Sequence, residues 1–215
     1  MRAILDSKMV KIQEYLLKMS AAVEEIVEKA IRALVEQDLA LANEVLELDT
    51  LIDELEEKIE KKCINVIATQ QPLASDLRKL SAILKIITDL ERIGDHAVNI
   101  AEVVIDIGDE KLIKPLVDIP KMADIARDMI RKSLDAYITE DDELATVVAQ
   151  MDDQVDDLYE GIYHELLDLY TEDRTITKQL TQLLFIGRYL ERIADHTTNI
   201  CERIIYMITG KREHY

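Results

Sequence analysis

The stretch LERIGDHAVNIAE at residues 90–102 returns at residues 190–202 as LERIADHTTNICE. The sequence Leu-Glu-Arg-Ile-x-Asp-His therefore occurs twice, 100 residues apart, and Asn and Glu follow in step in both copies. Similarity that returns at a fixed interval indicates two copies of one supersecondary unit. The chain is thus predicted to be an internal duplication.

The repeat extends well beyond this motif. With a shift of 103 residues, the following positions align: Lys18-Met19 with Lys121-Met122, Asp38 with Asp141, Asp49 with Asp152, Asp53 with Asp156, Leu55 with Leu158, and Glu57 with Glu160. Between the copies, Gly108 is followed by a segment in which Pro115 and Pro120 are expected to break any helix. The sequence predicts one repeat over residues 1–113 and a second over residues 114–215.

The composition indicates an all-α chain. Only five Gly and three Pro occur, and Trp is absent. In the first helix, apolar residues from Leu16 to Ala33 step by three and four, and Asp38 is a plausible N-cap for the second. The other helices are predicted near residues 38–70, 74–107, 118–139, 142–171 and 174–209. The expected fold is two tandem antiparallel three-helix bundles, similar to spectrin repeats.

The net charge of −18 argues against unaided binding to nucleic acid or to an anionic membrane surface. No signal peptide is apparent, and no apolar run approaches the length of about 18–20 residues that spans a bilayer. Cys63 and Cys201 are isolated thiols, typical of a reducing compartment. We therefore expect a cytoplasmic protein without direct membrane insertion.

Acidic residues recur four positions apart, which places them on one face of a helix. In the first copy one stripe is Asp49 and Asp53, and the other is Glu91 and Asp95, with the amide Asn99 one turn further along. The second copy repeats them as Asp152, Asp156, Glu191, Asp195 and Asn199. If two stripes meet, the carboxylates repel one another and their pKa values rise unless positive charge neutralises them. A hard cation that accepts oxygen ligands would supply that charge.

Acidic residues on helices are usually solvated or paired on the surface, and each of these residues taken singly fits that description. The comparison between the copies favours a site, because other charges differ freely: Glu24 aligns with Arg127, and Glu28 with Arg131. His96 and His196 each follow an Asp and point about 100° away from it. They are therefore left out of the predicted ligand set.

On these residues the chain resembles the PhoU family, the cytoplasmic regulators of phosphate-specific transport. The resemblance covers essentially the whole chain and rests on the ERI[GA]D core and the paired Glu/Asp-x-x-x-Asp motifs. It implies a protein that restrains phosphate uptake and phosphate-starvation signalling through the transporter's ATPase subunit and a sensor histidine kinase. It also implies multinuclear metal clusters, iron in particular, on the carboxylate motifs, with Glu57 and Glu160 as further candidate ligands.

Two other functions stay open at this point. One is a carboxylate-bridged metalloenzyme, either an oxidase or a phosphohydrolase. Ferritin-like sites use Glu-x-x-His, whereas here the nearest His follows Glu91 or Glu191 by five residues, so no enzyme is expected. The other is a metal-free helical adaptor whose stripes bind a basic partner. The long helices are compatible with a homodimer.

Overall fold

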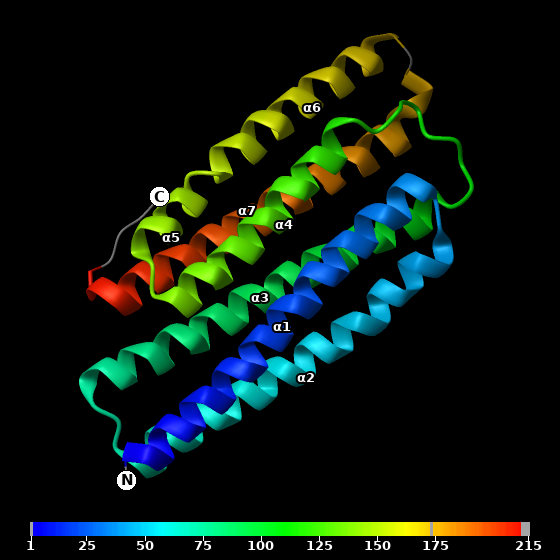
Figure 1. Ribbon diagram of the computed structural model, residues 1–215. Coiled ribbons are helices and arrows are strands. Elements are labelled where there is room, and N and C mark those ends of the chain that lie inside the picture. Colours follow the sequence, from blue (N-terminus) through cyan, green and yellow to red (C-terminus); the bar gives the residue numbers. More distant parts are fainter. Residues whose placement is uncertain (1, 173, 212–215) are drawn as a thin grey trace.

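The computed structural model describes residues 2–172 and 174–211, and its first repeat is an antiparallel bundle of three long helices (Figure 1). These are α1 (Arg2–Glu36), α2 (Leu39–Gln70) and α3 (Ala74–Ile107). Asp38 caps α2 as predicted, accepting hydrogen bonds from the N–H groups of Ala40 and Leu41 at 2.9 and 3.0 Å. The apolar seam of α1, including Leu16 and Met19, is fully buried in the bundle.

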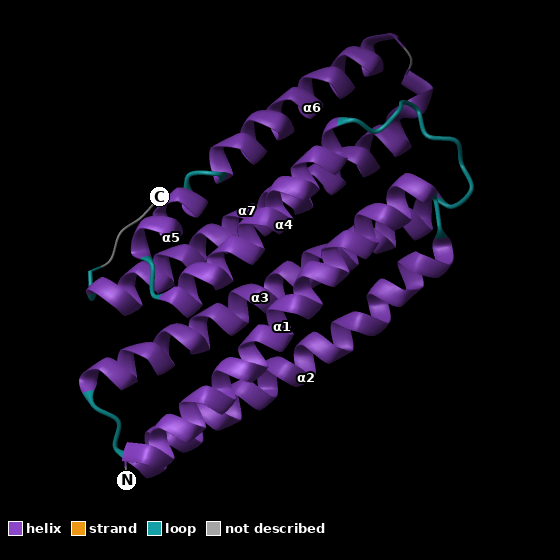
Figure 2. Ribbon diagram, in the orientation of Figure 1, coloured by secondary structure: helices purple, strands orange, loops and turns teal. Residues whose placement is uncertain are grey.

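The second repeat has the same course (Figure 1). It consists of α4 (Asp118–Thr139), α5 (Asp142–Ala149), α6 (Asp152–Glu172), the 3₁₀ turn η1 (Arg174–Ile176) and α7 (Thr177–Thr209). The described residues form helices and loops and include no strand (Figure 2). The predictions of an all-α chain and of two tandem three-helix bundles are therefore confirmed.

The middle helix of the second repeat differs from the prediction. One helix was expected over residues 142–171, but the chain leaves the helix at Gln150 and Met151 and begins α6 at Asp152. The Met151 N–H bonds to the Val148 carbonyl at 3.0 Å, three residues back instead of four, which tightens the turn. No Gly or Pro marks this break, so composition could not predict it. Its effect is to place Asp152 in the first turn of a helix.

The connection between the repeats runs from Gly108, which has a φ of 60°, to Val117. Pro115 lies within this connection, as predicted. Pro120 does not break a helix: it lies in the first turn of α4, where its missing N–H would have no helical partner. The prediction that both prolines interrupt the helices is therefore correct only for Pro115.

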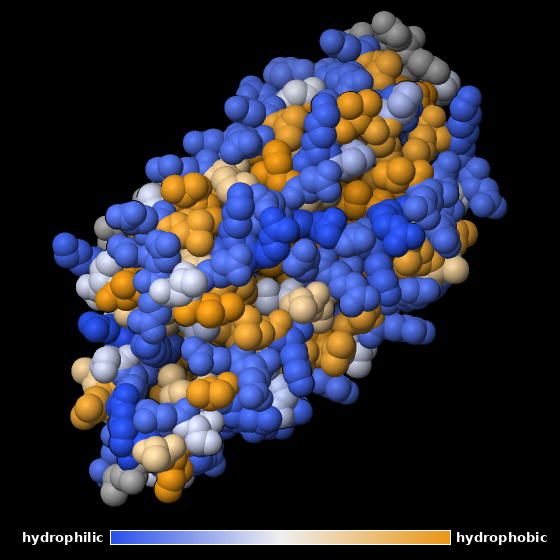
Figure 3. All heavy atoms as spheres, in the orientation of Figure 1, coloured by the Kyte–Doolittle hydropathy of each residue, from blue (hydrophilic) through white to orange (hydrophobic). Residues whose placement is uncertain are grey.

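The two bundles pack side by side, with α3 against α7 and α1 against α4 (Figure 1). Residues of the two copies thus share one hydrophobic core. On the face shown in Figure 3, hydrophilic residues cover most of the surface, and apolar residues gather where α6 passes the start of α4. Among the described residues, no helix combines the length and apolar character needed to cross a bilayer.

Candidate metal centre

In the first repeat, the acidic stripes of α2 and α3 meet. Asp49 lies directly against α3 at Gly94, where an added Cβ would be 3.4 Å from Asp49 Oδ1. Burial raises the pKa of Asp49, and the charges of Asp53 and Asp95 raise it further. Carboxylates from two helices are therefore close enough to oppose one another's ionisation. We call Asp49, Asp53, Glu91 and Asp95 the first cluster.

Glu91 is the most strongly affected carboxyl group of this first cluster. Burial, followed by the charge of Asp95, raises its pKa to about 7, against an opposing effect of Arg92. Asp49 Oδ1 is buried without a hydrogen-bond partner, whereas the buried Glu91 Oε2 has an ion pair with Arg92 Nε at 3.4 Å and no hydrogen bond. A buried acceptor without a partner costs free energy. The first cluster therefore contains oxygen atoms to which a donor or a cation would bind favourably.

The second repeat forms an equivalent cluster from α6 and α7. Burial raises the pKa of Asp152 to about 7, with added effects from the charges of Asp156 and Asp195. The pKa of Asp156 is raised by burial and then by the charges of Glu191 and Asp195. Asp152 Oδ1, like its counterpart Asp49 Oδ1, is buried without a partner. Both pairs of predicted stripes are thus brought together.

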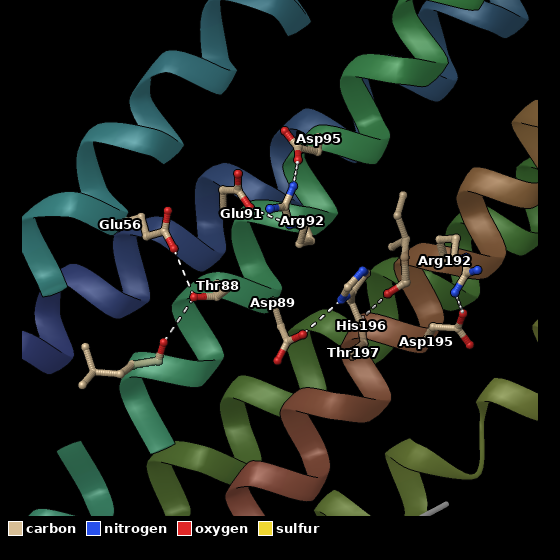
Figure 4. A network of polar contacts seen from close by, with 12 residues as sticks. Glu56, Thr88, Asp89, Glu91, Arg92, Asp95, Arg192, Asp195, His196 and Thr197 are labelled. Carbon is tan, nitrogen blue, oxygen red and sulfur yellow. Dashed lines mark hydrogen bonds and ion pairs between the residues drawn. The ribbon is translucent and has the colours of Figure 1, made fainter. Parts of the chain in front are cut away.

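Arginines flank both clusters (Figure 4). In the first, Arg92 Nη1 lies 2.8 Å from Asp95 Oδ2. In the second, Arg188 pairs with Glu191, and Arg192 Nη1 lies 3.3 Å from Asp195 Oδ2. Over residues 2–172 and 174–211, no three His, Cys, Asp or Glu side chains are arranged to hold one ion. Binding one ion would therefore require these carboxylates to rotate toward it.

The first cluster contains a fifth carboxylate, Glu56, which the sequence analysis missed. Its Oε1 accepts a hydrogen bond from Thr88 Oγ1 of α3 at 3.2 Å (Figure 4), and its charge contributes to the raised pKa of Glu91. Glu56 follows Asp49 by seven residues, so its direction from the axis of α2 differs from that of Asp49 by only about 20°. Glu57, one residue later, differs from Asp49 by about 80°. Glu57 instead pairs with Lys61 on its own helix and is 65% exposed. The spacing of seven was the signal that could have found Glu56.

The second cluster has Tyr159 where the first has Glu56. Burial raises the pKa of Tyr159, and the nearby charge of Glu191 adds to the effect. The ring reaches α7 because Gly187 leaves room: a Cβ there would lie 2.9 Å from Tyr159 Cδ2. Arg188 stands at the position of Thr88 in the aligned copies. The two clusters are therefore different, and the first carries more uncompensated negative charge.

Gly187→Ala is expected to destabilise the protein, because the new methyl group would displace the Tyr159 ring. We expect a loss of about 1–3 kcal/mol in the free energy of unfolding, measured by urea denaturation. Gly161→Ala is the matched control, since nothing lies within 4 Å of its added Cβ. It should stabilise the protein by about 0.5–1 kcal/mol through helix propensity. Equal effects of the two substitutions would contradict this account of Gly187.

The remaining polar residues of the motif lie elsewhere. Asn99 and Asn199 are half-buried one turn further along α3 and α7, and within the described chain neither side chain forms a hydrogen bond. Glu160, the counterpart of Glu57, is 74% exposed, and its Oε1 lies 3.7 Å from His164 Nε2. The prediction that these residues bind metal stays a prediction.

His96 and His196 meet across the contact of α3 with α7, with ring centroids 5.6 Å apart. His196 Nδ1 lies 3.0 Å from Asp89 Oδ1 (Figure 4), and His96 stacks on Tyr189. Burial, followed by the charge of His196, lowers the pKa of His96 to about 4. The histidines thus belong to the interface between the repeats, which sequence spacing could not indicate.

The fold and the site together define an all-α tandem-repeat protein with one carboxylate cluster in each repeat. Comparison with known families gives the same result at the level of sequence: the PhoU domain matches residues 16–104 and again residues 119–204. The chain belongs to the PhoU domain family.

Relatives and solved structures cover nearly the whole chain. A phosphate-specific transport system accessory protein PhoU homolog from Clostridium acetobutylicum is 42% identical over 212 residues, 98% of this chain and 97% of that protein. The crystal structure of PhoU from Pseudomonas aeruginosa superposes with a TM-score of 0.92 at 34% identity, covering 96% of this chain and 99% of that one. The crystal structure of the phosphate transport system regulatory protein PhoU from Streptococcus pneumoniae superposes with a TM-score of 0.91 at 30% identity. It covers 98% of this chain and 100% of that one.

Proposed function

We propose that this chain is an accessory protein of a phosphate-specific transport system that regulates phosphate uptake, and that its carboxylate clusters bind hard cations, iron first among them. The regulatory role is supported by the names of full-length relatives at up to 42% identity. The metal role is carried by one observation: both clusters contain buried carboxylate oxygens without a partner. An oxygen-rich donor set of this kind suits a hard cation.

Asp49, Asp53, Glu91 and Asp95 would hold the metal in the first repeat, and Asp152, Asp156, Glu191 and Asp195 in the second. Bound cations would supply positive charge that turns an acidic surface into one able to attract phosphate or an acidic partner. Arg92 and Arg192, once released by Asp95 and Asp195, would add to that charge from the rim of each cluster. Occupancy would thus couple metal binding to a change in surface charge.

The partners that the family resemblance implies are the transporter's ATPase subunit and a sensor histidine kinase, both reached from the cytoplasm. Metal binding would change the charge at the two clusters, so such partners would meet one surface in the metal-bound form and a more acidic one in the metal-free form. Regulation then requires a differential affinity of the partner for the metal-bound and metal-free forms.

A role without catalysis is supported by the positions of the histidines. His96 and His196 face Asp89 and Tyr189 at the repeat interface, away from the carboxylate stripes. Among the residues that the structure describes, no histidine thus complements the clusters in the way that Glu-x-x-His does in di-iron oxidases. Oxidase and phosphatase assays on metal-loaded protein are expected to stay at background. Turnover abolished by Asp53→Asn would support the metalloenzyme instead.

Elemental analysis tests the metal role directly. Wild-type protein, purified and reconstituted with ferrous iron under anaerobic conditions, is expected to retain several ions per chain. The variant Asp53→Asn, Asp95→Asn, Asp156→Asn, Asp195→Asn should retain none, because amides lack the charge that holds the cation. Metal should also raise the melting temperature of the wild type alone, since a ligand of the native state stabilises it.

The matched control replaces four exposed carboxylates outside the clusters: Glu36→Gln, Glu47→Gln, Asp135→Asn and Glu143→Gln. It changes the net charge by the same amount and should keep its metal. Loss of metal in this control would show non-specific binding to an acidic surface. Absence of metal from the wild type would leave two acidic docking surfaces on a helical adaptor.

A further inference from the structure

A cluster of lysines lies between α1 and α2, on a chain whose net charge is −18. Its members come from both helices, and we call the surface they form the lysine groove: Lys8, Lys11, Lys18, Lys58, Lys61 and Lys62. Four of them surround the ring of Tyr15, at 4.4 Å for Lys58, 5.2 Å for Lys62, and 5.7 Å for both Lys11 and Lys18. So many ammonium groups around one ring repel one another, which the cation–π contacts offset only in part.

Most of this charge is not neutralised by the protein. Lys11 pairs with Glu14 at 2.9 Å, and Lys61 pairs with Glu57. Lys8 Nζ contacts only neutral oxygens, 3.2 Å from Asn65 Oδ1. Within the described part of the chain, the three others form no ion pair with a carboxylate: Lys18, Lys58 and Lys62. The groove therefore presents about four uncompensated positive charges.

The lysines create a positive potential that acts on the phenol of Tyr15. Its burial raises the pKa of the phenol, but the charge and hydrogen bond of Lys58, followed by the charges of Lys11 and Lys62, outweigh burial and lower the pKa overall. The lysines thus stabilise negative charge at the centre of the groove. The same field would act on any anion that enters from outside.

The surface is hollowed beside Tyr15. A cavity of about 520 Å³ opens there, and its lining includes Ser7, Lys8, Lys11, Lys62 and Asn65. This volume lies within the range of about 300–1,000 Å³ typical of small-molecule sites. Beside the apolar side chains of Ile12 and Val66, the lining offers ammonium, hydroxyl and amide donors together. A flat anionic surface such as a bilayer would leave such a hollow unfilled.

The shape and chemistry of the groove select among anions. From Lys8 to Lys18 the lysines follow α1 for about 15 Å, so the charge is arranged in a row and not at a point. Each lysine binds a phosphate group as a point charge, so a row of lysines suits an anion whose phosphate groups follow one another along a chain. Four ammonium groups lie within 5.7 Å of the centre of the Tyr15 ring, so a nucleobase would have to displace them to stack there.

We propose that the lysine groove of α1 and α2 is a binding site for a soluble linear oligophosphate. The row of lysines would contact successive phosphate groups, and the cavity beside Tyr15 would hold one end of the chain. This site lies apart from the carboxylate stripes and needs no metal. A regulator with both sites would sense condensed phosphate independently of its cations.

The test is isothermal titration of metal-free, chelator-treated protein with sodium tripolyphosphate, so that no bound metal can contribute. The variant Lys11→Gln, Lys58→Gln, Lys62→Gln is expected to weaken binding about tenfold or more. The matched control is Lys79→Gln, Lys121→Gln, Lys132→Gln, three lysines paired with carboxylates elsewhere. It changes the net charge equally and should leave the affinity within about twofold. The variant lacking Asp53, Asp95, Asp156 and Asp195 should bind as the wild type does.

Several results would overturn the proposal. These are no binding of tripolyphosphate by the wild type, equal weakening by both lysine triples, or tighter binding of polyglutamate. Binding to phosphatidylglycerol vesicles without binding of tripolyphosphate would assign the groove to a membrane surface. If the groove triple does not fold, the exposed Lys58 carries the test alone, as Lys58→Gln against Lys79→Gln. Circular dichroism establishes folding for each variant before titration.

Discussion

Raising the pH from about 5 to about 8 is expected to lower the thermal stability of the metal-free protein. The pKa of Glu91 and that of Asp152 are each about 7 in the folded chain, against about 4.3 and about 3.9 when unfolded. At pH values between the unfolded and the folded pKa, these two carboxyl groups bind more protons in the folded state than in the unfolded state. Their contribution to stability is therefore complete below about pH 4 and is lost as the pH rises through about 7. Solvent screening reduces the effect below about 1.4 kcal/mol per pKa unit. His96 offsets part of it, because its pKa of about 4 lies below the usual value of about 6.5 and its contribution to stability therefore rises with pH over this range. A loss of about 2 kcal/mol would lower the melting temperature by about 4–8 °C.

The double variant Glu91→Gln, Asp152→Asn should remove most of this dependence and melt above the wild type at about pH 8. Glu47→Gln, Asp135→Asn is the control at two exposed carboxylates, and it should follow the wild-type profile. Added iron should reverse the slope in the wild type, because ionised carboxylates bind the cation more tightly. Melting curves followed by circular dichroism, with and without chelator, measure each case. A flat profile for the metal-free wild type would contradict the raised pKa values.

Leu90→Ala and Leu190→Ala are each expected to lower the free energy of unfolding by about 3–5 kcal/mol. These leucines open the two copies of the motif and have no exposed surface. Removing either side chain leaves a cavity that the packed helices close only in part. Since the whole stability of a domain is about 5–15 kcal/mol, each loss is a large fraction of it. Leu17→Ala, at a residue 40% exposed, should change the free energy by about 0.5 kcal/mol or less.

Both variants should still unfold in one transition, because α3 and α7 pack together and join the two repeats. Urea denaturation followed by circular dichroism and by tyrosine fluorescence measures this, and the two signals should coincide. Two separate transitions in Leu90→Ala, with the second unchanged from the wild type, would show that the repeats unfold independently. The shared core would then contribute little to the stability of either bundle.

Most of the helices, the duplication and the acidic stripes could be predicted from the sequence. These features are local: apolar residues at steps of three and four bury one face of a helix, and Asp38 satisfies the N–H groups at a helix start whatever packs around it. The resemblance to the PhoU family, read from ERI[GA]D and its spacing, was likewise confirmed. The stripes were predictable because a spacing of four fixes direction on a helix.

The residues that each stripe faces could be found only from the packing of the helices. Glu56 joins the first cluster and Tyr159 the second because α2 and α6 approach their neighbours at those turns. His96 and His196 meet because α3 packs on α7, a contact between residues 100 positions apart. Periodicity gives the direction of a side chain from its own helix axis, whereas its neighbours depend on how separate helices pack. For that reason the carboxylates could be predicted from the sequence, whereas their unequal surroundings became visible only in the structure.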